Sequence, residues 1–485
     1  MENPLTGLLL WIDLVNIWSG KSDNIHGEKT VSDEYLKFLD SKTQYSGDHG
    51  FDPIWVPDKL FPFQKYLLEY SLRKGRSAIF ADCGLGKTGI QLAWAENVAQ
   101  KTGKPVLVLT PIAVGHQTVK EGEKFGVECK RSLDGKVHRI TIANYERLHY
   151  FSPNDFGGVV CDESSILKNF RGKTSNQIVD FMRHTPYRLL CTATASPNDY
   201  MELGTSSEAL GELGYQDMVS TFFRQVKNTD GTAWGRQKYT FRAHAINDFW
   251  RWVCSWSRAV RKPSDIGFDD SGFILPDLET FEHVAKSSVL RPGQLFEMPA
   301  QNIQEQSEER RRTLKDRCHM VADLVDHDDP VVIWCHLNPE GDYLQKIIPG
   351  SVQVSGSDSE EKKEKAFMAF CDGSIKRLIT KPSIAGFGQN WQHCGHQTFF
   401  PSHSFEEYYQ AVRRCLRFGR KGKVRVDIIS SEGEYGVLEN LNRKAKNASA
   451  MFDSLIENMN NAMRIDRAHE YTKKEVLPSW LLSTK

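Results

Sequence analysis

Residues 77–88 read SAIFADCGLGKT, and this stretch decides how the rest of the chain is interpreted. Residues 77–81 are short and apolar, as a buried strand would be, and a helix-prone run extends from the loop to Trp94. Between them, Gly84 and Gly86 allow backbone N–H groups to curl around an anion, which the start of the helix also attracts. The pattern predicts a phosphate-binding loop. An ordinary glycine turn ahead of a helix is the alternative.

The side chains after the glycines are of the types that a nucleoside triphosphate needs. Lys87 is expected to reach the β and γ phosphates, and the Thr88 hydroxyl is expected to hold a magnesium ion. Ala81 stands where the full phosphate-loop pattern has its first glycine, so the motif is AxxGxGKT. The residues of this loop expected to bind ATP are Gly84, Leu85, Gly86, Lys87 and Thr88.

Two carboxylates follow a second apolar run later in the chain. Residues 158–161 read GVVC and lead directly into Asp162 and Glu163. Asp162 is expected to hold magnesium, usually through water, and Glu163 to polarise the water that attacks the γ-phosphate. Taken alone, such a pair is often only a solvated loop. Its place downstream of a phosphate loop favours the catalytic interpretation.

Further short apolar runs predict two separate parallel sheets. Most are continuously apolar rather than alternating, as strands buried on both faces are, and helix-length stretches separate several of them. The first series lies at residues 77–81, 106–110, 140–143, 158–161 and 187–191, and the second at 331–334, 351–354, 377–380, 397–400 and 424–429. The sequence therefore predicts an α/β protein with two lobes.

The regions around these lobes differ in composition. Residues 200–275 look mainly helical, and apolar residues at helical spacing after Glu434 predict a C-terminal helix that braces the second lobe. The expected division is an N-terminal accessory segment at 1–54, lobe 1 at 55–199, a helical and basic insertion at 200–275, a linker at 276–325, lobe 2 at 326–430 and a C-terminal helical brace at 431–485.

Composition and charge exclude several classes of protein. The 485 residues are 40% hydrophobic and 26% charged, so neither a disordered nor a collagen-like chain fits. Lys plus Arg and Asp plus Glu number 62 each, which excludes a histone-like tail and requires a polyanion to meet a local basic surface. The ten cysteines form no CxxC pair and are expected to be reduced, buried thiols. Because no apolar run is long enough to cross a membrane, we expect a soluble, cytoplasmic protein.

With further motifs in the same order, the chain resembles a superfamily-two helicase or translocase over residues 55–430. Besides the two motifs above, the resemblance rests on FPFQ at 61–64, LTP at 109–111, TATASP at 192–197, a segment at 380–392 containing AGFGQN, and QAVRRCLRFGR at 410–420. Such proteins have two tandem RecA-like lobes with parallel sheets. The resemblance implies ATP and Mg²⁺ bound between the lobes, and a nucleic acid as partner.

The resemblance also implies roles for individual residues. Those implied for binding ATP, beyond the phosphate loop, are Gln64 and Gly386. Those implied for coupling ATP to movement are Thr192, Thr194 and Gln410. The expected nucleic-acid contacts are Thr110, Pro111, Thr380, His336 and Arg258.

Two arginines complete the implied catalytic set of Lys87, Asp162 and Glu163. Arg414 and Arg417, expected as helical neighbours at i and i+3, would enter from the second lobe and stabilise charge on the transferring phosphate. The alternative is that they form a solvated basic helix face.

Three features are similar to the Swi/Snf-type branch of the superfamily: DESSILKN at 162–169, the stretch 258–265 followed by LP at 275–276, and QAVRRCLRFG. Annealing-helicase members carry His where this chain has Ser165, and that histidine normally makes a coupling contact. The loop ADCGLGKT is one residue shorter than the branch's usual ADEMGLGKT. The chain is therefore identified as a compact, divergent member, of the kind seen in bacteria and their phages.

A basic and aromatic stretch between Phe222 and Lys262 is a second candidate for nucleic-acid contact. It holds nine Lys or Arg against two Asp, interleaved with aromatic side chains that could stack on bases. The alternative is that Trp250, Trp252 and Trp256 simply pack a helical subdomain.

The predicted function is that of a nucleic-acid-dependent ATPase that moves on or remodels duplex, forked or single-stranded DNA during replication or repair. Two alternatives stay open: an RNA helicase of the same fold, and an ATP-gated DNA-binding module with little turnover. The second would work beside a nuclease or another phage or defence protein, and Ser165 and the lack of a recognisable nuclease cluster keep it open. Replication or repair proteins are further possible partners. No membrane partner is expected.

Overall fold

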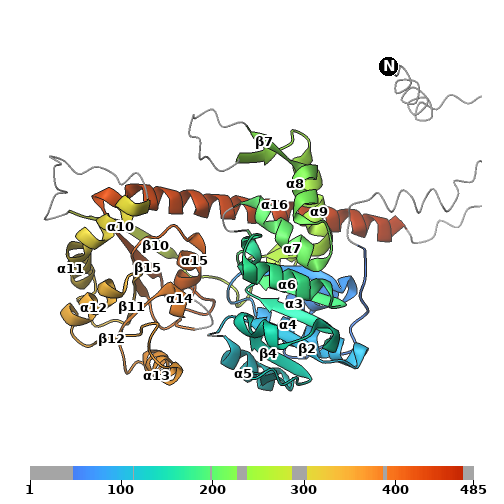
Figure 1. Cartoon of the computed structure of the whole chain (residues 1–485), viewed down its shortest axis with the longest axis horizontal. Helices are drawn as coiled ribbons and strands as arrows, with labels where there is room; N and C mark the ends of the chain where they lie inside the picture. The colour runs from blue at the N-terminus through green and yellow to red at the C-terminus, as the bar shows by residue number, and fades with distance from the viewer. Residues whose placement is uncertain are drawn as a thin grey trace, which may run out of the picture. The chain divides into compact units, whose positions relative to one another are not determined.

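The computed structural model describes residues 47–112, 114–196, 199–226, 238–286, 303–385 and 390–472 (Figure 1). Within these ranges the chain forms two lobes, each built on its own parallel sheet, and a two-stranded hairpin. The predicted α/β class, with two parallel sheets, a helical insertion and a C-terminal helix, is confirmed. None of the helices in this described part has both the length and the hydropathy that a membrane span requires.

The first sheet has seven strands. They are β1 (Arg76–Ala81), β2 (Val106–Thr110), β3 (Lys130–Arg131), β4 (Ile140–Asn144), β5 (Gly158–Asp162), β6 (Tyr187–Thr192) and β9 (Ser257–Val260). Their order is β3-β4-β2-β5-β6-β1-β9, and every neighbouring pair is parallel. Strands β2, β4 and β5 are buried at every position, as expected when helices cover both faces of a parallel sheet.

The helix that follows the phosphate loop packs closely on the centre of this sheet. The helices of the first lobe are α3 (Pro62–Lys74), α4 (Lys87–Thr102), α5 (Gly115–Phe125) and α6 (Lys173–Arg183), with short 3-10 helices η1 (Tyr145–Tyr150), η2 (Pro153–Asp155) and η3 (Ser164–Lys168). Gly158 lets α4 approach β5, because a Cβ there would lie 2.8 Å from Val98 Cγ1. This packing fixes the helix whose first turn carries Lys87.

The described part of residues 200–275 forms the expected helical insertion and also supplies one strand, β9, to the first sheet. The elements are η4 (Tyr200–Glu202), α7 (Leu203–Leu210), α8 (Tyr215–Phe222), β7 (Phe223–Val226), β8 (Lys238–Phe241), α9 (Ala245–Trp256), β9 and η5 (Pro263–Ile266). β9 pairs in parallel with β1 and completes the first sheet. It is only four residues long and includes Arg258, so it lacks the continuous apolar run that identified the other strands.

The tryptophans of α9 belong to the core of the first lobe. Trp250, Trp252 and Trp256 are 3%, 1% and 0% exposed. The ring of Trp256 lies edge-on to Phe80 of β1, with centroids 6.0 Å apart. The packing alternative is therefore confirmed for these three residues, and they are not available for stacking on bases.

The second sheet has six strands, all parallel. They are β10 (Leu278–Ala285), β11 (Val331–Trp334), β12 (Ser351–Gln353), β13 (Arg377–Thr380), β14 (His396–Phe399) and β15 (Val424–Ser431). Their order is β10-β15-β14-β11-β13-β12. β10 pairs with β15 over its whole length, so part of the segment expected as a linker belongs to this sheet. As an edge strand it is mostly exposed and mixes charged with apolar residues, and no buried run marks it in the sequence.

The second lobe carries shorter helices and continues into α16 (Tyr435–Thr472), the longest helix in the described part of the chain. They are α10 (Ile303–Arg312), α11 (Leu314–Leu324), α12 (Asn338–Ile347), α13 (Glu360–Cys371), α14 (Pro382–Ala385), α15 (Phe405–Val412), the 3-10 helix η6 (Glu432–Glu434) and α16 (Tyr435–Thr472). All ten cysteines are unpaired, as expected; nine are buried, and Cys371 at the end of α13 is exposed.

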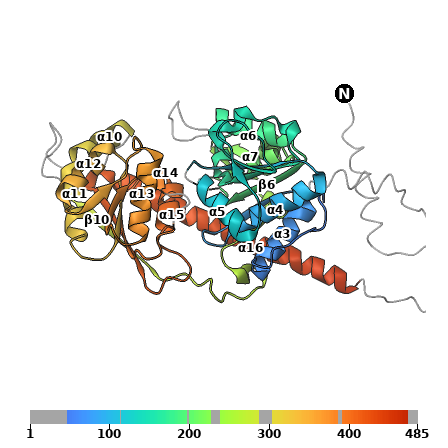
Figure 2. The ribbon, with the colours of Figure 1, turned by 90° about the horizontal axis from the view of Figure 1, so that it is seen from below.

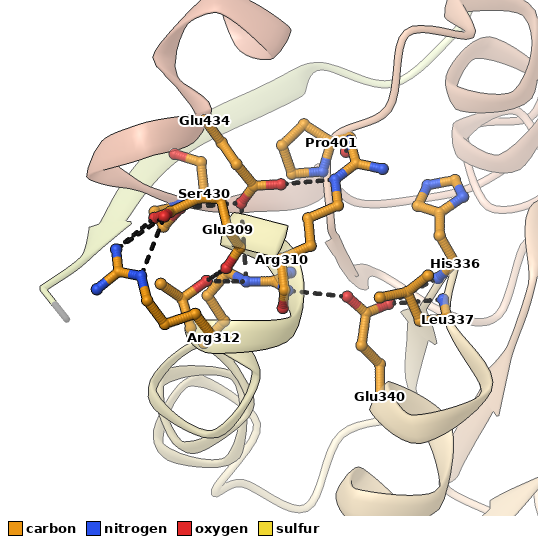
Figure 3. Close-up of polar contacts among 12 residues, drawn as sticks. Glu309, Arg310, Arg312, His336, Leu337, Glu340, Pro401, Ser430 and Glu434 are labelled. Carbon is orange, nitrogen blue, oxygen red and sulfur yellow. Dashed lines mark hydrogen bonds and ion pairs between the residues drawn. The ribbon is translucent and has the colours of Figure 1, made fainter. Parts of the chain in front are cut away.

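Charged side chains that are buried or partly buried join several of these elements (Figure 3). Arg310 donates through Nε to Glu434 Oε1 at 2.8 Å and through Nη2 to Pro401 O at 2.9 Å. Arg317 Nη2 donates to Glu340 Oε1 at 3.0 Å. Because each of these buried carboxylates has a guanidinium partner, the cluster offsets the cost of removing the charges from water. It also anchors the loop at Pro401, which leads into α15.

Helix α16 packs on both lobes, not on the second alone. Leu438, near its start, belongs to the core of the second lobe. Met451, Leu455 and Met459 belong to the core of the first lobe, where α16 packs on α9 and β9. Figure 1 shows α16 beside α9, and Figure 2 shows α16 from below. The sequence predicted a brace on the second lobe; α16 also packs on the first, because these apolar residues share the helix face that meets α9.

We expect Leu455→Ala to destabilise the first lobe by about 3 kcal/mol, because it leaves a cavity beneath a fully packed helix. The measurement is the urea-unfolding midpoint followed by tryptophan fluorescence. Glu457→Ala, at an exposed position two residues further along α16, is the matched control and should shift the midpoint little. Equal midpoints for the two variants would contradict the packing of α16 on α9.

Candidate nucleotide site

The phosphate loop joins the end of β1 to the start of α4, in the predicted order of strand, loop and helix. Gly84 and Gly86 have φ values of 89° and 75°, in the left-handed region that glycine adopts without strain. Gly86 directly precedes the helix, so Lys87 lies in its first turn, followed by Thr88. Lys87 Nζ donates to Ala81 O at 2.9 Å and therefore lies inside the curve of the loop.

Gln64, expected to bind ATP, lies against this loop. Its side chain is 5% exposed, and its Nε2 donates to Leu85 O at 2.8 Å while its Oε1 accepts from Phe61 N at 2.9 Å. A Cβ on Gly86 would lie 2.3 Å from Gln64 Nε2, so the glycine permits this approach. Gln64 thus ties the start of α3 to the phosphate loop. Its contact with a nucleotide base stays a prediction.

Asp162 and Glu163 lie at the end of β5, beside the end of β6. Asp162 Oδ1 accepts from Gln91 Nε2 of α4 at 2.7 Å. Among the described residues, Glu163 is the non-glycine residue with positive φ, 53°. Such a conformation costs about 1 kcal/mol, and strained residues of this kind gather at functional sites. Thr192 Oγ1 donates to Glu163 Oε2 at 3.2 Å, so a residue expected in coupling contacts the expected base directly.

Burial and neighbouring charges shift the pKa values of this group. Burial raises the pKa of Asp162 and of Glu163 above their ordinary values, and Asp162 raises that of Glu163 further. Burial, the largest single effect, lowers the pKa of Lys87, but the nearby charges of Glu163, Cys83, Asp162 and Asp82 together outweigh it, so the pKa of Lys87 is raised. Lys87 in turn favours the ionised carboxylates, which leaves a cation between two acids at the base of the loop.

The second lobe reaches Glu163 through α15. Gln410 Nε2 donates to Glu163 Oε2 at 3.4 Å, the same oxygen that accepts from Thr192. Gln410 Oε1 accepts from Arg414 Nη2 at 3.0 Å, and Arg414 is buried. Thr194 N donates to Thr192 Oγ1 at 3.1 Å. The three residues expected in coupling are therefore linked around one carboxylate.

Arg414 and Arg417 are not neighbours on a helix, and the expected i and i+3 helical spacing is wrong. Helix α15 ends at Val412; Arg414 lies in the turn that follows, and Arg417 lies beyond that turn in a segment without regular structure. Arg414 Nε donates to Gln410 O. In a continued helix, the backbone N–H of Arg414 would bond this carbonyl, but here it bonds Ala411 O. Burial, with the nearby charge of Arg414, lowers the pKa of Arg417 to about 10.

A further contact between the lobes was not predicted from the sequence. Asp82, in the phosphate loop, accepts hydrogen bonds from the Tyr409 hydroxyl and from Arg413 Nη2 of the second lobe. Asp82 Oδ1 also accepts from Cys83 N at 2.6 Å. The signals available in the sequence were an acid inside ADCGLGKT and the paired arginines of QAVRRC, but nothing in either motif states that they meet.

The residues expected to contact nucleic acid are placed differently from one another. Thr110 ends β2 and Thr380 ends β13; both are buried, and Thr380 Oγ1 donates to Val354 O at 3.3 Å. Pro111 is partly exposed and lines a groove between the lobes that Ser165 also lines. Lysines from both lobes border this groove: Lys120, Lys168 and Lys363.

His336 and Arg258 turn inward. Burial lowers the pKa of His336 to about 4, and its ring lies edge-on to Phe399 with centroids 5.5 Å apart. The Arg258 guanidinium lies 4.0 Å from the centre of the Tyr70 ring and donates to Cys254 O at 2.6 Å. Their contacts with nucleic acid stay predictions. Gly386, expected to bind ATP, lies outside the described residues.

The residues present fit a magnesium nucleotide. The loop offers backbone N–H groups, a helix start and a buried ammonium for phosphates, and Thr88 and Asp162 are oxygen donors of the kind that Mg²⁺ takes. The raised pKa of Asp162 fits a carboxylate whose charge needs a cation nearby. Lys87 and the loop would hold the phosphates, and Thr88 and Asp162 would hold the metal ion.

No family model matches the chain. A protein named p41 from Acyrthosiphon pisum secondary endosymbiont phage 1 is 26% identical over 208 residues, which cover 36% of this chain and 45% of that protein. The match thus spans less than half the length of the phage protein. Among solved structures, the Sulfolobus solfataricus SWI2/SNF2 ATPase core in complex with dsDNA is similar, with a TM-score of 0.39 and 16% identity over 79% of this chain and 90% of that one. The α/β fold itself follows from the strand order and registers given above.

We expect Gly86→Ala to disturb the nucleotide site beyond its effect on stability. The left-handed φ alone should cost about 1 kcal/mol, and the new Cβ would also displace Gln64 from the loop. Gly103→Ala is the matched control, because Gly103 ends the same helix with φ 65° and has open space around it. The midpoint temperature of thermal unfolding should fall by a similar amount in both variants. The affinity for a fluorescent ATP analogue should fall only in Gly86→Ala. Equal affinities would contradict the role given to the Gln64 contact.

Proposed function

We propose that the chain is an ATP- and magnesium-dependent DNA translocase or helicase that hydrolyses ATP between its two lobes. The observation that supports this most is the meeting of both lobes at Glu163, whose Oε2 accepts from Thr192 in the first lobe and from Gln410 in the second. A carboxylate at the end of a buried strand, beside a phosphate loop and within reach of a second lobe, is suited to hydrolysis that depends on closure of the lobes.

The proposed chemistry uses residues already in place. Bound ATP supplies the phosphoanhydride bond that is broken. Glu163 accepts a proton from the attacking water, and its raised pKa makes it a stronger base than a free glutamate. Lys87, Arg414 and Arg417 supply positive charge where negative charge develops on the transferred phosphate.

Movement on DNA would follow from the contacts between the lobes. Gln410 holds Glu163 only while α15 lies against the first lobe, so any step of the cycle that moves α15 away from the first lobe would break this hydrogen bond. Repeated closing and opening would shift a grip on the DNA backbone by a step per cycle. Such contacts position phosphates rather than read bases, so no sequence specificity is expected.

We expect Lys87→Ala to lose nucleotide affinity and Glu163→Gln to keep it, with DNA-stimulated phosphate release slowed by about a hundredfold or more in the second variant. Lys101→Ala, at an exposed position near the end of α4, is the matched control. The assay is steady-state phosphate release with magnesium and single-stranded DNA, duplex DNA, forked DNA or RNA.

The polymer that stimulates phosphate release distinguishes the three candidate functions. Stimulation by duplex or forked DNA supports the translocase. Stimulation by RNA alone would favour the RNA helicase, and nucleotide-dependent DNA binding without turnover would favour the ATP-gated module. Unchanged release in Glu163→Gln would rule out its role as base.

The rate of phosphate release should fall on the acid side at a higher pH than a free glutamate would cause. Burial and then Asp162 raise the pKa of Glu163, so protonation, which removes its ability to accept a proton, begins above the ordinary value of about 4.3. The measurement is kcat at saturating magnesium–ATP and DNA from pH 4.5 to 8.5. A rate that stays flat down to pH 4.5 would contradict this assignment.

A further inference from the structure

Helix α15 and the residue that directly follows it, Arg413, contact the first lobe through two pairs of side chains spaced four residues apart. Such residues lie next to each other on one face of a helix. Tyr409 and Arg413 both donate to Asp82 of the phosphate loop. The other pair is Glu406 and Gln410, and both members contact the segment that begins with Glu163. One short helix therefore contacts both expected catalytic segments.

Glu406 makes two contacts across the boundary between the lobes. Its Oε1 accepts from the Ser165 hydroxyl, and its Oε2 accepts from Lys168 Nζ. Ser165 and Lys168 lie in η3, the short helix that Glu163 caps. Glu406 is 7% exposed, so its charge is largely removed from water and depends on these two donors.

The geometry relates these contacts to Glu163 in two ways. Ser165 lies two residues after Glu163 in the chain, so a hold on Ser165 limits how far the Glu163 backbone can turn. One helical turn further along α15, Gln410 donates to Glu163 Oε2. If Glu406 leaves Ser165, the same movement of α15 carries Gln410 away from Glu163.

Helix α15 is itself held at the right place by the second lobe. Ser404 Oγ accepts from Glu407 N and caps the helix. The preceding loop is fixed at Pro401, whose carbonyl accepts from Arg310 Nη2, and Arg310 is bound in turn to buried Glu434 (Figure 3). Glu406 is thus presented from an anchored helix start and not from a free loop.

We propose that Glu406 is a positioning residue: its contacts with Ser165 and Lys168 latch α15 onto η3 and so place Gln410 against Glu163. Through this latch, side chains of the second lobe reach the hydrolytic site by contacts between protein groups alone, without a bound nucleotide. The inference rests on the proposed function only for its hydrolysis readout, because the latch itself is a contact between lobes that can be measured without ATP.

The test is a charge reversal and its rescue in the full chain. Glu406→Lys places two ammonium groups together and should lower kcat for DNA-stimulated phosphate release by about tenfold or more, with little change in KM for ATP. Lys168→Glu should do the same. The double variant Glu406→Lys with Lys168→Glu restores an ion pair and should recover a large part of kcat. Glu439→Lys, at an exposed position on α16, is the matched control.

A second readout does not require hydrolysis. Spin labels on Cys371, the exposed cysteine of the second lobe, and on Gln177→Cys, an exposed position on α6 of the first lobe, report the distance between lobes. The distance distribution should be narrow in the parent chain, broad in Glu406→Lys and narrow again in the double variant.

The outcomes separate this proposal from the proposed function. A narrow distribution that broadens on charge reversal, in a protein that releases no phosphate with any polymer, would support the latch and count against the ATPase. The latch would be overturned by any of three results: a kcat unaffected by Glu406→Lys, a loss of kcat equal to that in Glu439→Lys, or a kcat in the double variant no higher than in the single variants. A rescued kcat with a restored distance supports both.

Discussion

Parallel pairing of three strands is the constraint on which the site depends. The pairing of β1 with β6 sets Phe80 beside Thr192, and the pairing of β6 with β5 sets Cys191 beside Asp162. Because the strands run the same way, their carboxyl ends meet at one edge of the sheet. The phosphate loop, the Asp-Glu pair and the threonine that contacts Glu163 are thereby brought together from distant parts of the sequence. No side chain needs to reach far: Thr192 donates to Glu163 at 3.2 Å.

Bringing these groups together has an electrostatic cost that the local structure offsets in part. Burial raises the pKa of both carboxylates, Asp162 raises that of Glu163 further, and the protein supplies donors that favour the ionised forms. Gln91 donates to Asp162, and Thr192 and Gln410 donate to Glu163. Lys87 lies close enough to lower both pKa values. The pKa values are nevertheless raised, which is the condition expected of a site that takes up a divalent cation and a proton.

How far the sequence could predict this structure depends on where the determining interactions lie. The central strands could be predicted because burial on both faces requires continuous apolar runs, as in residues 106–110. The phosphate loop could be predicted because its glycines and lysine are adjacent in the chain. Edge strands β9 and β10 could not be, because one side of each has no neighbouring strand among the described residues and their sequences carry charge.

The second half of the site was predicted by residue but not by contact. The motif QAVRRCLRFG identified Gln410 and Arg414, yet not that the helix would end at Val412. Past that end the Arg414 side chain, and not its backbone N–H, bonds the Gln410 carbonyl, a choice between two donors that no spacing rule specifies. The partners of Asp82 and Glu406 lie more than 200 residues away in the chain. Contacts of that kind appear only once both lobes are folded.

Helix α16 limits how the lobes can move relative to each other. Leu438 is buried in the second lobe and Leu455 in the first, and a straight helix places them about 25 Å apart at 1.5 Å per residue. Between Leu441 and Met451 the sequence NRKAKNASA has no large apolar side chain to seat in either core. Opening of the lobes must therefore bend α16 within this polar stretch or break its apolar packing on one of the two lobes. Bending costs less, because it breaks no core packing, so the latch at Glu406 could open while both ends of α16 stay in place.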